Sequence, residues 1–132
     1  MDGTAYVEHM ILLTQRKQEA LAYLCRCLES DEEHNQSSKQ KWYFDQKNKV
    51  EKAILKVDIE FLDAYHHLLA QEKVAHLDEL PKEKFATIAL LQQEISKIQT
   101  LEKRIEAGEN TLLEASKHMA PRAIAAYKKL KK

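Results

Sequence analysis

Histidine and carboxylate residues at helical spacing are the side chains of this sequence that could suit a metal site. The chain has 6 histidines, and the candidate pairs are Asp63–His66, Glu72–His76 and Glu114–His118. Each pair would lie on one face of a helix. A di-iron bundle, however, needs Glu-x-x-His on two helices and a glutamate on each of two others, and Glu-x-x-His does not occur here. The pairs stand beside Lys and Gln, as solvated helix faces do, so we expect no metal and no cofactor.

Residues that could act as nucleophiles lack the surroundings that catalysis requires. Cys25 and Cys27 are two positions apart, a spacing that places them on opposite faces of a helix and does not match the Cys-x-x-Cys of zinc and redox sites. We interpret them as small apolar helix residues. No serine stands in a Gly-x-Ser-x-Gly turn, and no glycine-rich loop could hold a phosphate. The sequence therefore predicts that the protein is not an enzyme.

The charges of the chain balance at 21 basic and 21 acidic residues. This balance produces no long-range field that would attract nucleic acid or an anionic membrane, although the chain ends in the basic run KKLKK. No apolar run approaches the roughly 18–20 residues of a membrane span. The N-terminal MDGTAYVEHM carries acids where a signal peptide carries Lys and Arg. We expect a cytoplasmic protein that binds no nucleic acid and does not insert into a membrane.

The elements that must position these residues are helices. The sequence has only 2 glycines and 2 prolines, the residues that most readily end a helix or let the chain turn. Apolar residues recur at three- and four-residue steps. These features predict a single all-α domain over residues 1–132, an elongated antiparallel bundle or coiled coil. Its three long helices would cover about residues 4–30, 39–79 and 82–118, and a short basic helix would cover residues 122–131.

The predicted second helix carries two adjacent apolar rows, which make a face wide enough to contact two other helices. One row includes Val57 and Phe61, and the second consists of Leu55, Leu62 and Leu69. The excess of apolar residues has two interpretations that the sequence leaves open. The wide stripe either packs a core of three or four helices, or part of it faces another polypeptide.

The segment AILKVDIEFLDAYHHLLAQEKVAHLDEL (Ala53–Leu80) has a distinctive order of apolar and acidic residues. A long Leu/Ile helix follows it, and the chain then continues into AIAAYKK (Ala123–Lys129). Over about residues 50–130 this pattern resembles the small helical export chaperones of bacterial flagellar type III secretion, of the FlgN and FliT kind. The resemblance implies a cytoplasmic chaperone without ATPase activity. Such a chaperone binds an amphipathic helix at the end of a filament-cap or hook-junction subunit and keeps that subunit competent for export.

The same resemblance implies that the C-terminal helices hold the client. The residues of this sequence that would then bind the partner helix are Leu101, Ile105, Leu112, Leu113, Ala115, Met119, Ile124 and Tyr127. The alternative is a structural coiled-coil or adaptor protein that binds other proteins or itself, as in a homodimer, and has no client cycle.

Overall fold

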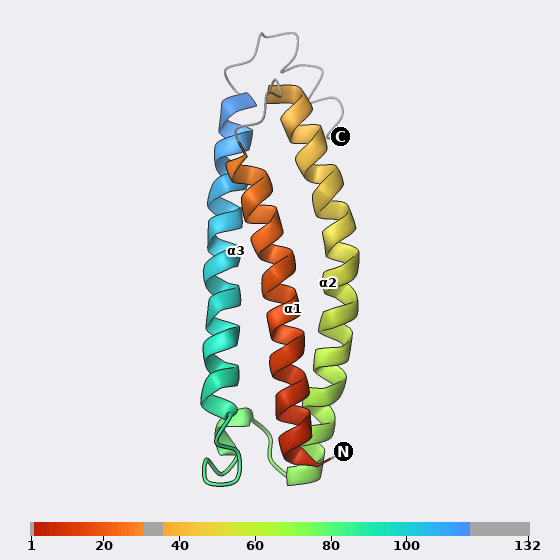
Figure 1. Cartoon of the computed structure of the whole chain (residues 1–132), viewed down its shortest axis with the longest axis vertical. Helices are drawn as coiled ribbons and strands as arrows, with labels where there is room; N and C mark the ends of the chain where they lie inside the picture. Colours follow the sequence, from red (N-terminus) through yellow and green to blue (C-terminus); the bar gives the residue numbers. More distant parts are fainter. Residues whose placement is uncertain (1, 31–35, 117–132) are drawn as a thin grey trace.

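Three long helices make up most of the structure. The computed structural model describes residues 2–30 and 36–116, with all their side chains except those of 36–38 and 115–116. It contains α1 (Gly3–Glu29), α2 (Gln36–Glu72), a short 3-10 helix η1 (Leu77–Glu79) and α3 (Ile88–Ser116). The helices run up, down and up along one elongated body (Figure 1). Among the described residues there is no strand, so the prediction of an all-α fold with three long helices is confirmed. The predicted basic helix 122–131 lies outside these residues.

The first helix is the central element of the bundle. Asp2 caps its N-terminus, where Oδ1 accepts a hydrogen bond from the Ala5 backbone N–H at 2.8 Å. Helix α1 packs extensively along both α2 and α3, whereas α2 and α3 contact each other much less. A helix with a neighbour on each side must bury more than one face. This explains why Cys25 and Cys27, on different faces of α1, are both buried free thiols.

The core has two parts along the length of the bundle. The lower cluster, near the lower end of Figure 1, includes Val7, Met10, Leu68 and Leu91. The upper cluster, near the upper end, includes Leu24. The remaining members of the upper cluster are Leu21, Cys25, Cys27, Tyr43, Ile98, Ile105 and Leu112. The apolar rows that the sequence pattern identified on each helix therefore meet inside the bundle, as the 3.6-residue period requires.

The second helix ends at Glu72 and not at residue 79, which corrects the prediction made from the absence of glycine and proline. Lys73 takes a left-handed conformation with φ of 56°. The backbone N–H of Lys73 donates to the carbonyl of Ala70, and that of Val74 donates to the carbonyl of Leu69. These two bonds form the Schellman motif that commonly ends a helix, usually with glycine in the left-handed position. A lysine there gave no signal in the sequence.

The third helix begins at Ile88 rather than at residue 82, because residues 73–87 form a loop that closes one end of the bundle. Phe85 is buried at this end, and its ring lies so close to Gly3 that a Cβ on that glycine would come within 2.6 Å of it. The Pro81 carbonyl accepts hydrogen bonds from the backbone N–H groups of Lys84 and Phe85. Pro81 therefore shapes a turn and does not start the helix.

Candidate functional site

A groove runs between α2 and α3, with α1 as its floor. Because α2 and α3 contact each other so little, they leave a cavity of about 250 Å³ near the middle of the bundle. Leu13 of α1 forms part of its floor, Val57 and Phe61 of α2 form one wall, and Ile95 and Ile98 of α3 form the other. Half of the lining residues are aliphatic or aromatic, and the other half are polar or charged: Thr14, Lys17, Asp58, Gln99 and Glu102.

A second cavity of about 380 Å³ continues the groove along the bundle. Its apolar lining comes from Leu21 and Leu24 of α1, Ile54 of α2 and Ile105 of α3. Three residues line both cavities, which makes them parts of one groove: Lys17, Asp58 and Glu102. Leu13 and Leu21 are eight residues apart on α1, so these two parts of the lining are separated by roughly 12 Å along the helix axis.

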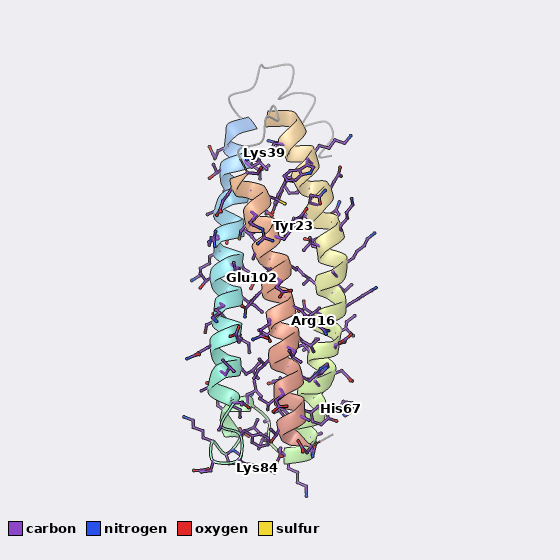
Figure 2. The ribbon with its side chains drawn as sticks, viewed as in Figure 1. Arg16, Tyr23, Lys39, His67, Lys84 and Glu102 are labelled. Carbon is purple, nitrogen blue, oxygen red and sulfur yellow. The ribbon has the colours of Figure 1, made fainter. Side chains whose placement is uncertain are left out.

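Charged side chains line the groove, and most of them are acidic. Lys17 Nζ lies 2.9 Å from Asp58 Oδ1, an ion pair that joins α1 to α2 across the floor. Glu102, on α3 about half-way along the bundle (Figure 2), and Glu106 add negative charge without an ion pair to any described residue. The excess of carboxylates favours a ligand that carries cationic groups beside its apolar surface.

A polar cluster ties the groove walls together near one end. Lys47 Nζ lies 2.6 Å from Glu109 Oε2, and the hydroxyl of fully buried Tyr43 donates a hydrogen bond to the same carboxylate. Burial raises the pKa of Tyr43 well above its ordinary value, and the Glu109 carboxylate raises it further. Tyr43 therefore remains a neutral donor over the physiological pH range. These contacts fix the distance between α2 and α3 at this end.

The residues expected to bind a partner helix fall into three groups. Ile105 and Leu112 are only 7% and 6% exposed and belong to the core cluster with α1. Leu101 is partly buried against the same cluster, and Leu113 is half-buried. The side chain of Ala115 is not among those that the structure describes. The last three residues lie outside the described ranges: Met119, Ile124 and Tyr127. Ile105 and Leu112 therefore hold the bundle together, although Ile105 also reaches the wall of the second cavity.

Several side chains that the sequence suggested as metal ligands or nucleophiles take part in ion pairs or are buried in the core. Glu72 forms an ion pair with Lys84 at 3.0 Å, and Asp63 lies 3.4 Å from the ring of His67. Within residues 2–30 and 36–116, no three His, Cys, Asp or Glu side chains converge as metal ligands would. Burial raises the pKa of the Cys25 thiol, which favours its protonated form. The arrangement that stands out in these residues is the groove.

Comparisons with models of known protein families, with curated proteins and with solved structures found no match for this chain. None of the helices in the described residues is long and apolar enough to cross a membrane.

The groove residues were visible in the sequence only as members of apolar stripes. Val57, Phe61 and Ile95 have the same helical spacing as residues that are fully covered. One signal did point toward the groove: Lys17, Asp58 and Glu102 are charged residues that interrupt or border those stripes. Charged side chains at the edge of an apolar stripe are typical of a face that is only partly covered.

Proposed function

We propose that the protein is a helix-binding chaperone that holds an amphipathic helix of a secreted flagellar subunit in the groove between α2 and α3. The observation that carries the proposal is the groove itself, a channel with apolar and acidic lining that is left open because α2 and α3 each pack on α1 and barely on each other. A fourth helix laid along such a channel would complete a four-helix arrangement. Helix-in-groove binding is a common way in which proteins recognise peptides.

The geometry of the groove defines the helix that it would accept. A separation of roughly 12 Å corresponds to about eight residues of a bound helix, a little more than two turns, so its main anchors would be large apolar residues at positions i and i+7. Because Glu102 and Glu106 stand on the α3 side of the groove, Lys or Arg beside those anchors would strengthen binding. The assignment to a flagellar subunit, and to export in the cytoplasm, rests on the resemblance to the FlgN and FliT kind of chaperone.

Binding is tested with the terminal helical segments of the filament-cap and hook-junction subunits of the same organism, titrated against the full chain. Glu102→Lys changes an exposed side chain that borders both cavities. We expect it to weaken binding on the order of tenfold and to leave the melting temperature nearly unchanged. The matched control is Glu19→Lys, which reverses an exposed charge on α1 that lines neither cavity.

Three results would contradict the proposal. The first is that neither segment binds, and the second is that Glu19→Lys weakens binding as much as Glu102→Lys does. The third is that binding responds to Ile124→Glu and not to changes in the groove, which would move the client site to the C-terminal residues expected from the resemblance. Release of the bound segment during export distinguishes a chaperone from a structural adaptor, which would keep its partner.

A further inference from the structure

We propose that the outer face of α2 is a self-association surface, on which a second copy of this chain packs its own α2 in the antiparallel direction. The surface consists of Leu55, Ile59 and Leu62, which are 60%, 59% and 52% exposed. We call these three residues the α2 stripe. Their spacing of four and then three residues places them on one side of the helix.

The α2 stripe is separate from the groove. The residues of α2 that line the groove or the core, Val57, Phe61 and Leu68, lie on the opposite half of the helix from Ile59. Most of the exposed large apolar residues found elsewhere in the described parts of the chain stand singly, such as Leu12 and Leu90. Three adjoining apolar side chains at half-exposure or more are a feature of interaction surfaces rather than of ordinary solvated helices.

The charges beside the α2 stripe identify a second copy as its occupant. Lys56 and Asp63 are both exposed and lie on the same edge of the stripe, seven residues or two turns apart. In an antiparallel pair related by a twofold axis, each edge faces the same edge of the other helix. With the axis between Ile59 and Leu62, Lys56 stands opposite the partner's Asp63, and Asp63 stands opposite the partner's Lys56.

The same register joins the apolar residues. Ile59 packs on the partner's Leu62, and Leu62 packs on the partner's Ile59, as a twofold dimer requires. Leu55 lies opposite the partner's His66, which is also exposed. Lys56 forms no ion pair with any described residue, and the ion pair that the described residues offer Asp63 is with the exposed ring of His67 at 3.4 Å. Both side chains are exposed and can therefore reach a partner.

The expected dimer is weak. One helix crossing with a short apolar seam falls in the class of interfaces that bury less than about 1,200 Å² in total, which is typical of transient complexes. We therefore expect a dissociation constant no tighter than about 1 µM.

Sedimentation velocity of the full chain over micromolar to millimolar concentrations tests the proposal. The wild type should show a reversible monomer–dimer equilibrium. Ile59→Glu should be monomeric throughout the range while keeping the wild-type melting temperature, because the residue is already exposed. Leu12→Glu is the matched control: Leu12 is 54% exposed but lies on α1, so this variant should dimerise as the wild type does.

A charge exchange tests the direction of packing. Lys56→Glu should weaken the dimer on the order of tenfold, because it faces the partner's Asp63 at both ends of the seam. Adding Asp63→Lys to that variant should restore dimerisation. A wild type that stays monomeric, or an Ile59→Glu variant that still dimerises, would show that a second copy does not occupy the α2 stripe. If the double variant does not recover dimerisation, the antiparallel register is wrong. Binding of helical segments to the groove should be the same in Ile59→Glu and the wild type, so the two proposals fail independently.

Discussion

Gly108 is the residue whose replacement tests the close packing of α1 against α3 most directly. It lies inside α3, which continues to Ser116 without interruption. Glycine in a helix interior is less stable than alanine by about 1 kcal/mol, so Gly108→Ala would stabilise a freely exposed helix. In the bundle, however, a Cβ at this position would lie 2.9 Å from Leu28 Cδ1 and 3.2 Å from Leu28 Cβ. The glycine is present because α1 leaves no room for a side chain.

The expected magnitude follows from these two opposing terms. The terminal methyl of Leu28 can rotate away, but its Cβ cannot move without its backbone, so α1 and α3 must separate by a few tenths of an ångström. Overpacking of this kind costs about 1–3 kcal/mol, which exceeds the gain in helix propensity. We expect Gly108→Ala to lower the free energy of unfolding by roughly 1 kcal/mol. In a Leu28→Gly background the Cβ, Cγ and Cδ1 contacts of residue 28 are all gone, and the same change should become neutral or stabilising.

The assay is a double-mutant cycle measured by urea unfolding and far-UV circular dichroism. The four proteins of the cycle should give a coupling energy of about 1–2 kcal/mol between positions 28 and 108. Ala107→Gly is the matched control, because it alters an exposed neighbour in the same helix. It should cost about 1 kcal/mol in both backgrounds. A Gly108→Ala variant that is more stable than the wild type, with no coupling to Leu28, would refute the close approach of the two helices.

Two further predictions concern a helix end and a buried carboxylate. Lys73→Gly should raise the free energy of unfolding by roughly 0.5–1 kcal/mol, since glycine takes the left-handed conformation without the steric cost that a side chain carries; an equal gain from Lys73→Ala in urea unfolding would assign the effect to charge instead. The side-chain hydrogen bond from Gln18 lowers the pKa of Glu94 below its ordinary value of 4.5, and Lys97 lowers it further. The carboxylate form of Glu94 therefore stabilises the fold at pH values above 4.5, and this contribution is lost as the pH falls through the lower, folded-state pKa. Glu94→Gln should reduce the loss of stability in acid-unfolding curves, and an unchanged pH dependence would contradict this.

The helices themselves could be predicted well from local pattern. The first helix was expected at about residues 4–30 and occupies Gly3–Glu29, because its apolar spacing and the following polar segment are both local features. The ends at Glu72 and Ile88 could not be predicted in the same way. Helix α2 ends before Lys73, which takes the left-handed position where a glycine is usual. The loop that follows is held in place by the burial of Leu80 and Phe85 at the end of the bundle.

The residues of the candidate site could be predicted from the sequence less well than the helices could. Ile105 and Leu112 have the spacing of a binding stripe, yet the structure places them in the core. Conversely, Leu55 and Leu62 were counted in a row with Leu69, but only Leu69 is covered. Helical periodicity identifies which side of a helix is apolar, and it carries no information about which neighbour lies on that side.

By itself, then, the sequence determined that this chain forms long amphipathic helices, since backbone propensity and apolar spacing act within a few turns of one segment. Only the tertiary structure decided that α1 lies between the other two helices, that an acidic groove opens between α2 and α3, and that the outer face of α2 stays exposed. The physical reason is that burial depends on contacts between segments far apart in the chain. Many arrangements of the same three amphipathic helices satisfy the local pattern equally well.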